Sequence, residues 1–192
     1  MLRCLSLSML LAVGTISFAA NWPQFRGENG SGVTSDTKLP VTWSNTQNVL
    51  WKSEIPGRGV SSPVVAGDHI YVTSNSGIRQ DRLHVLCYSL SDGKLLWQRQ
   101  LTATGNTGCH PVTTMAAPTP VATSEGVYAL FATGDLAAFD QEGTLKWYRS
   151  LVGDYPTLGN QVGMGDRQLH LIEQQGLAHC GFQQFNLPRR LV

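Results

Sequence analysis

The sequence predicts an all-β fold, a partial β-propeller with about two complete four-stranded blades and stray strands at both ends. The main observation is a repeat with a period of about 50 residues, which is typical of propeller blades built from short strands. Trp97 closes the first copy and Trp147 closes the second. Of the 192 residues, 20 are glycine, 9 are proline and only 14% are charged, which suits a turn-rich β protein. Since one blade cannot bury both of its faces, we expect the two copies to stack.

The first 19 residues are predicted to be a signal peptide. Arg3 supplies the positive charge, residues 5–13 form the apolar run, and Ser17-Phe18-Ala19 offers a small-x-small cleavage pattern. The run is short for a membrane span, and no later stretch approaches ~20 apolar residues. We therefore expect an exported chain, periplasmic, extracellular or in the cell envelope, with no membrane span in its mature part.

Residues 20–164 are predicted to form the propeller fragment, which begins with an extended lead-in. Residues 21–40 are rich in glycine and proline, with Trp22 and Phe25 among their few large side chains. Val49 to Ile55 is apolar and β-branched enough to predict a strand, and it contains a further tryptophan, Trp51. We expect it to be the outer strand of a blade whose other strands lie elsewhere.

The two complete blades are expected at about residues 61–100 and 116–150. Each copy has paired strand patterns joined by short turns, for which glycine and aspartate accept the backbone geometry; the turn residues are Gly67, Asp68, Asp92, Gly93, Glu142 and Gly143. Between the blades, residues 105–118 are predicted to form a long, polar, flexible loop. Loops of this kind often carry function.

Two segments carry a family resemblance. Residues 87–97 follow the pattern Cys-x-Ser-x-x-Asp-Gly-x-x-x-Trp, and residues 138–147 follow Ala-x-Asp-x-Glu-Gly-x-x-x-Trp. Both resemble the tryptophan-docking motif of PQQ-like β-propeller repeats, and Trp22-Pro23-Gln24-Phe25-Arg26-Gly27 resembles the lead-in of exported bacterial propellers of that kind. The resemblance implies that Trp97 and Trp147 pack between adjacent blades, and that Gly93, Gly143 and Asp140 shape the turns. The first copy departs from the motif at Cys87 and Ser89, where alanine and aspartate are usual.

Residues 165–192 do not continue the pattern. After Gly163-Met164 a third copy is due, but Gly165-Asp166 follows at once, and beyond Gly176 there is neither an Asp-Gly turn nor a tryptophan. Two explanations stay open: a genuine divergent tail, or an out-of-frame one. The second would make the chain a truncated or frame-damaged member of the family.

Few residues suggest chemistry. Cys109-His110 is the one pair resembling a nucleophile with a base, but adjacent residues on a strand point to opposite sides, so no catalytic residue is predicted. Arg58, Ser61 and His110 are candidates for a ligand site at the blade rim. After removal of Cys4 with the signal peptide, Cys87, Cys109 and Cys180 remain without zinc-like spacing, so no metal is predicted.

These observations favour a non-enzymatic binding scaffold with a protein or glycan partner. With 14 basic and 13 acidic residues, nothing indicates nucleic-acid binding. The resemblance also implies an alternative, a remnant of a PQQ-dependent (quinoprotein) dehydrogenase-like enzyme, and only then would PQQ and calcium be cofactors. A gene fragment without function is the third possibility. Since two blades leave strand edges open, self-association is also expected.

Overall fold

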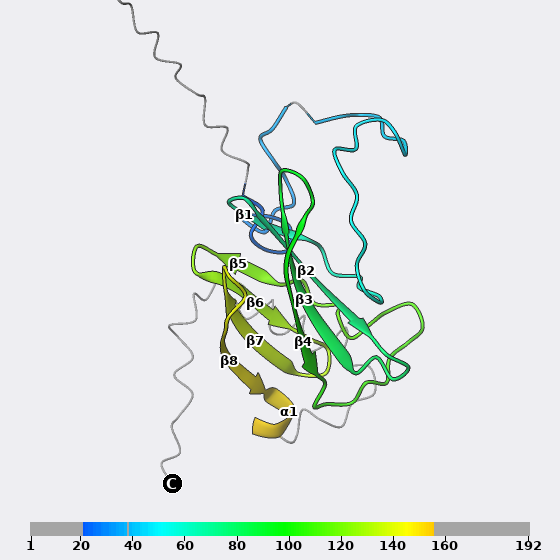
Figure 1. Ribbon diagram of the computed structural model, residues 1–192, viewed down its shortest axis with the longest axis vertical. Helices are drawn as coiled ribbons and strands as arrows, with labels where there is room; N and C mark the ends of the chain where they lie inside the picture. Colours follow the sequence, from blue (N-terminus) through cyan, green and yellow to red (C-terminus); the bar gives the residue numbers. More distant parts are fainter. Residues whose placement is uncertain (1–20, 38, 156–192) are drawn as a thin grey trace, which may run out of the picture.

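The computed structural model describes residues 21–37 and 39–155, which form two four-stranded antiparallel sheets with their strands in sequence order (Figure 1). The first sheet contains β1 (Val64–Ala66), β2 (His69–Ser76), β3 (Arg82–Ser89) and β4 (Leu95–Thr102). The second contains β5 (Val121–Thr123), β6 (Gly126–Leu130), β7 (Asp135–Asp140) and β8 (Leu145–Ser150), and a short helix, α1 (Leu151–Asp154), follows it. The predicted all-β fold with two complete blades is confirmed. The predicted signal peptide and the tail 165–192 lie outside the described residues.

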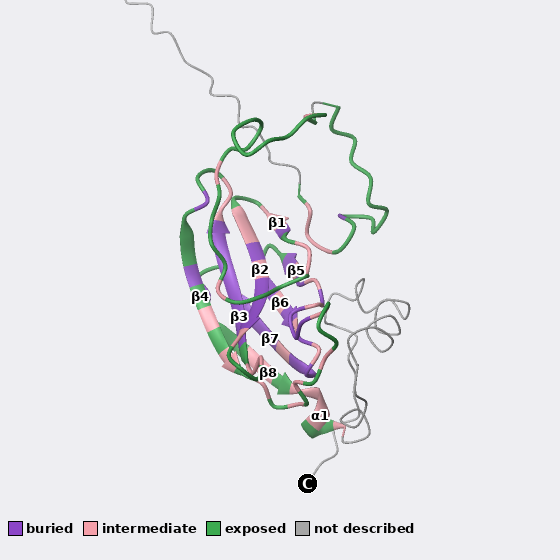
Figure 2. Cartoon of the chain, turned by 90° about the vertical axis from the view of Figure 1, so that its right-hand side faces the viewer, coloured by how far each residue is buried: buried purple, intermediate pink, exposed green. Residues whose placement is uncertain are grey.

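The core lies between the two sheets, where buried side chains gather (Figure 2). Along β3 every second residue from Leu83 to Cys87 contributes to it, because successive side chains of a strand point to opposite faces. The first sheet supplies Tyr71, Val85 and Cys87, and the second supplies Val127 and Phe139. The two blades thus stack face to face, as the repeat predicts.

The strands of the two sheets pair in the same register. Ile70 pairs with Tyr88 in the first sheet as Val127 pairs with Phe139 in the second. A β-bulge follows the residue opposite each blade tryptophan, after Cys87 in the first sheet and after Ala138 in the second. Residues at matching positions can therefore be compared directly between the blades.

The lead-in ties the two innermost strands together. Trp22 forms an isolated bridge with Val65 of β1, with two N–H to O hydrogen bonds of 2.9 Å. One residue further on, the Pro23 carbonyl accepts a hydrogen bond of 2.8 Å from the amide of Ala122 on β5. The segment thus covers backbone groups of both inner strands, which would otherwise form an open edge.

Two expectations from the sequence need correction. Residues 49–55 do not form a strand. A strand needs a neighbour for its ladder, and no described strand pairs with this segment through its backbone. The segment instead bonds to the β3–β4 turn through the side chains of Trp51 and Ser53. The loop 105–118 is not polar and flexible throughout, because Thr114, Met115 and Ala116 are buried, the last two in the core.

Candidate functional site

The tryptophans of the repeat lie where one blade meets the turn of the next. The indole of Trp97 is 8% exposed and donates a hydrogen bond of 2.7 Å to the Gln141 carbonyl. It covers Gly143, which has φ 78°, and a Cβ added there would lie 2.6 Å from the ring. Glycine therefore provides both the turn conformation and the space for the ring. The neighbouring Asp140 carboxylate accepts a hydrogen bond from the Thr144 amide in the same turn.

Trp51 repeats this arrangement one blade earlier. Its indole donates a hydrogen bond of 2.9 Å to the Leu90 carbonyl and covers Gly93, where an added Cβ would lie 2.4 Å from the ring. Residues 49–55 thus keep the tryptophan contact of an outer strand without forming the strand. Trp147, the third tryptophan of the series, is partly buried, and its ring centroid lies 6.1 Å from that of Tyr128.

The opposite end of the blades gathers the longer loops. We call this the loop end; it comprises the β2–β3 turn (residues 77–81), the connection from 103 to 120, the β6–β7 turn (residues 131–134) and α1 (Figure 1). The candidate residues Arg58 and His110 both lie here. The Arg58 guanidinium donates a hydrogen bond of 2.9 Å to the carbonyl of Pro111, next to His110.

Asn75 holds three segments of the loop end together. Its backbone forms a bridge with Arg58, with N–H to O distances of 2.8 Å in both directions. Its side-chain amide donates to Gln80 Oε1 at 3.0 Å and accepts from the Ala116 amide at 3.2 Å. Asn75 is 2% exposed, so these contacts satisfy a buried amide and fix residues 57–59, 77–81 and 114–116 relative to one another.

Cys109 and His110 have separate hydrogen-bond partners. Cys109 is partly buried, and Gln80 Nε2 lies 3.3 Å from its sulfur. His110 is exposed, and its Nδ1 accepts a hydrogen bond of 3.3 Å from the amide of Val112. The third candidate, Ser61, is partly buried and hydrogen-bonds the Thr73 hydroxyl at 2.8 Å. Arg58 and the segment of His110 are thus brought together, while Ser61 has a contact within the inner part of the blade.

A buried carboxylate stabilises the loop end of the second blade. Asp135 is 0% exposed and accepts hydrogen bonds from the Thr104 amide and hydroxyl and from the hydroxyls of Thr133 and Tyr148. Burial, and then the hydrogen bond to Asp135, raises the pKa of Tyr148 to about 12. The carboxylate has enough donors to remain buried without a cation, and it fastens the inter-blade connection to both β7 and β8.

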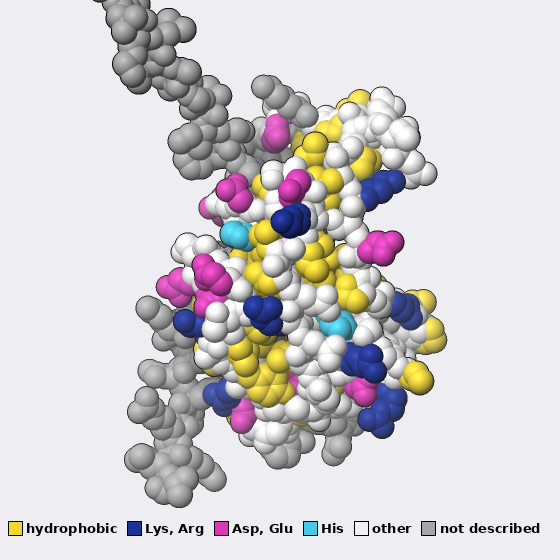
Figure 3. Space-filling view, in the orientation of Figure 1, with side chains coloured by type: hydrophobic (Ala, Val, Ile, Leu, Met, Phe, Trp, Pro, Cys, Tyr) yellow, Lys and Arg dark blue, Asp and Glu magenta, His cyan; other side chains and the backbone are white. Residues whose placement is uncertain are grey.

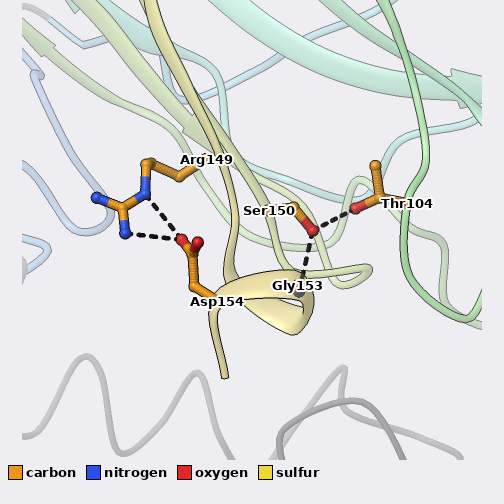
Figure 4. A network of polar contacts seen from close by, with 5 residues as sticks. All are labelled: Thr104, Arg149, Ser150, Gly153 and Asp154. Carbon is orange, nitrogen blue, oxygen red and sulfur yellow. Dashed lines mark hydrogen bonds and ion pairs between the residues drawn. The ribbon is translucent and has the colours of Figure 1, made fainter. Parts of the chain in front are cut away.

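Thr104 extends this cluster to the helix (Figure 4). Its hydroxyl lies 2.7 Å from that of Ser150, which caps α1 by accepting from the Gly153 amide at 3.2 Å. Beside it, Arg149 and Asp154 form an ion pair with an N–O distance of 2.7 Å. The connection, the outer strand and the helix therefore form one hydrogen-bonded unit.

The first blade carries the same arrangement with different residues. His84 occupies the position of Asp135, Ser76 that of Thr133, and Gln98 that of Tyr148. His84 is 3% exposed, with its ring nitrogens 2.8 Å from the Ser76 hydroxyl and 3.3 Å from the Gln98 amide nitrogen. Burial, and then the Arg82 charge, lowers the pKa of His84. An amide N–H2 group can only donate, so Nδ1 of His84 accepts from Gln98 and the imidazole N–H on Nε2 faces the Ser76 hydroxyl.

An apolar groove of about 540 Å³ lies on the face of the first sheet away from the core. The segment 51–63 forms one wall, and Ile70, Val72 and Tyr88 form the other. In the second sheet the matching residues Val127, Ala129 and Phe139 belong to the core and face the first blade. The groove therefore lies on the face that another blade would cover.

Within residues 21–37 and 39–155, no three His, Cys, Asp or Glu side chains are grouped so as to hold a metal ion. A calcium site needs six to eight oxygen ligands, and the one fully buried carboxylate found, Asp135, is occupied by hydroxyl and amide donors. No helix described here is long and apolar enough to span a bilayer.

Sequence patterns did not reveal Asn75, Gln80 or Asp135. Their partners lie far along the chain: 31 residues separate Thr104 from Asp135, and 41 separate Ala116 from Asn75. One signal was present, because His84 and Asp135 are polar residues at the same position of the two copies.

Comparisons with known proteins agree on the architecture. A model of the family described as outer membrane protein assembly factor BamB matches residues 25–176. A search of curated proteins found no match. Among solved structures, the chain is similar to BamB from Moraxella catarrhalis (22% identity, TM-score 0.38, 52% of this chain and 26% of that one).

Two quinohemoprotein alcohol dehydrogenases are also similar to the chain. The enzyme from Comamonas testosteroni has 17% identity and a TM-score of 0.51 over 71% of this chain and 20% of that one. The enzyme ADHIIG from Pseudomonas putida HK5 has 18% identity and a TM-score of 0.37 over 55% of this chain and 15% of that one. The chain thus spans about a quarter of the matched BamB and a fifth of the Comamonas enzyme. The likeness to the Comamonas enzyme shows a shared fold.

Proposed function

The chain belongs to the PQQ-like β-propeller repeat family, whose matching model is described as outer membrane protein assembly factor BamB, and from this premise we propose that it is an exported, non-enzymatic scaffold that binds a protein partner in the cell envelope. The proposal includes no bound quinone and no calcium. The likeness of the chain to quinohemoprotein alcohol dehydrogenases does not decide whether it is an enzyme, because function depends on the site and not on the fold.

The observation that carries the proposal is that polar side chains of the loop end hydrogen-bond to other parts of the chain. Asp135 accepts hydrogen bonds from Thr104, Thr133 and Tyr148, and Asn75 connects three segments. These contacts hold loops in place. The side chains at the loop tips, such as Ile78 and Val112, are exposed and apolar. Fixed loops with exposed apolar tips suit binding of a macromolecule, as is common for loops on a rigid scaffold.

A direct test of binding uses a photo-crosslinking amino acid at Val112 in the full chain, expressed in a bacterial host and analysed in the envelope fraction. We expect protein adducts from Val112 and none from the same substitution at Lys94, which is exposed in the β3–β4 turn at the opposite end. Equal crosslinking at both positions, or none at either, would contradict a scaffold that binds through its loop end.

The enzymatic alternative has its own test. The full chain is incubated with PQQ and calcium, and dye reduction is followed across alcohols and sugars. We expect no substrate-dependent reduction. Turnover that a chelator abolishes would overturn the scaffold proposal.

A further inference from the structure

The loop tips at the loop end form a compact surface with both positive charge and exposed apolar side chains. We define the rim patch as Arg58, Ile78, Arg79, His110 and Val112. Ile78 is 105% exposed and Val112 is 77% exposed, although both are aliphatic. In the view of Figure 3, basic and hydrophobic side chains gather at the lower right, where the loops of Figure 1 lie.

Hydrogen bonds hold the three segments of the patch side by side. Arg58 is joined to Pro111 at 2.9 Å and to Asn75 by its backbone bridge. Asn75 in turn holds Gln80 at 3.0 Å, and Gln80 reaches the sulfur of Cys109 at 3.3 Å. The patch is therefore presented by fixed loops, which lowers the entropy lost on binding.

The turn between β2 and β3 is held in an unfavourable conformation. Gln80 has φ 57°, in the left-handed region that non-glycine residues seldom adopt. Its contacts with Asn75 and Cys109 retain this conformation and project Ile78 and Arg79 at the tip of the turn. Strain of this kind is common where a protein presents residues for binding.

The charge of the patch selects the partner. Arg58 and Arg79 contribute two guanidinium groups, and Asp81 forms an ion pair with Arg79 at 3.7 Å. The Arg79 side chain remains 81% exposed in spite of this contact. A guanidinium at such a site can donate two parallel hydrogen bonds to one carboxylate.

We propose that the rim patch binds an extended acidic segment of a partner protein, whose carboxylates pair with Arg58 and Arg79 and whose aliphatic side chains cover Ile78 and Val112. This inference rests on the proposed scaffold function and specifies the chemistry of its partner. Because side chains of an extended chain alternate between two sides, the acidic and aliphatic residues that face the patch occupy every second position of the segment.

The test measures fluorescence anisotropy of a labelled peptide with the full chain; aspartate and leucine take turns at every second position of the peptide, with serine between them, so that both face the same side. We expect saturable binding that weakens as salt rises, since exposed charges are screened. The same peptide with lysine in place of aspartate, or with serine in place of leucine, is expected not to bind. Equal binding of all three peptides would overturn the inference. So would binding of vesicles of phosphatidylglycerol and phosphatidylcholine in place of the acidic peptide.

Variants locate the site. Arg79→Glu and Ile78→Ser change exposed side chains outside the Asn75 contacts, and each is expected to lower the peptide affinity about tenfold. Lys94→Glu and Leu145→Ser make matched changes outside the patch, and Leu145 is 46% exposed. These controls are expected to keep the affinity. Thermal melting by circular dichroism confirms that each variant is folded. Equal loss in the controls and the patch variants would overturn the inference.

The two proposals can fail separately. Crosslinking from Val112 without binding of the acidic peptide would overturn this inference and leave the scaffold function standing. Absence of crosslinking from Val112 would overturn the scaffold function itself.

Discussion

At the scale of single residues, Trp97 determines how the two blades meet. Its ring contacts rings on both sheets, with centroids 5.9 Å from Tyr71 and 6.0 Å from Phe139. The Arg99 guanidinium lies 5.6 Å from the ring centroid and donates to the Gly143 carbonyl at 2.6 Å. One side chain thus joins the core, the turn of the next blade and a cation above the ring.

Removing this ring should destabilise the chain strongly. We expect Trp97→Ala to lower the free energy of unfolding by about 3–5 kcal/mol, because a large core side chain is lost and a cavity remains. Chemical denaturation followed by circular dichroism measures the change. Trp43→Ala is the matched control; Trp43 is 65% exposed, so its loss should change stability by no more than about 0.5 kcal/mol. Similar losses in both variants would show that Trp97 is not a packing residue.

Asp135 offers a second prediction at this scale. In Asp135→Asn the acceptor for Tyr148 loses its charge, so the pKa of Tyr148 should fall from about 12 while remaining raised by burial. Spectrophotometric titration, with Tyr148→Phe to identify the signal, measures the pKa. We also expect about 1–3 kcal/mol of destabilisation from imperfectly paired buried donors. An unchanged Tyr148 pKa would contradict the role given to the carboxylate.

At the scale of elements, the docking turn depends on glycine for two separable reasons. Gly143 and Gly67 both have positive φ, 78° and 57°, but only Gly143 lies under an indole; nothing lies within 4 Å of a Cβ at Gly67. Gly67→Ala should therefore cost about 1 kcal/mol from the backbone alone. Gly143→Ala should cost more and expose Trp97, which its fluorescence would report. Equal costs for the two variants would mean that the indole contact contributes nothing.

Elements with local signals were predictable from the sequence, and those that depend on distant partners were not. The turns at Gly67, Gly93 and Gly143 are encoded locally by the need for positive φ. The segment 49–55 has the composition of a strand, yet a strand exists only beside a neighbour, and composition does not supply one. The polar contacts of the loop end join strands to turns and to the connection between the blades, far along the chain, so only the comparison of His84 with Asp135 could have indicated them.

At the scale of the whole molecule, two buried weak acids, Cys87 and Tyr148, should make the free energy of unfolding fall at alkaline pH. Burial raises the pKa of Cys87 from 9.0 to about 12, and burial with the Asp135 hydrogen bond raises that of Tyr148 from 10.0 to about 12. The unfolded chain therefore loses these protons first as pH rises. The contribution of these two groups to the free energy of unfolding should be full below about pH 9 and fall between pH 9 and 12. Urea denaturation at stepwise pH tests this, and Cys87→Ala should remove the part of the loss that begins near pH 9.

The outer strands and the groove predict the association state. Leu95 and Leu96 on β4 are 44% and 46% exposed, while the lead-in covers only the inner strands. With the groove of about 540 Å³ between segment 51–63 and the first sheet, the described fold presents both an open edge and an apolar groove. We expect the full chain to self-associate, so that light scattering gives a mass that rises with concentration.

Leu96→Lys should shift this association toward the monomer, because an edge lysine opposes strand pairing. Thr102→Lys, near the end of β4 away from the two leucines, is the control and should have a smaller effect. A wild-type chain that stays monomeric and melts cooperatively at every concentration would contradict the prediction. It would mean that neither the outer edge of β4 nor the apolar groove between segment 51–63 and the first sheet drives association.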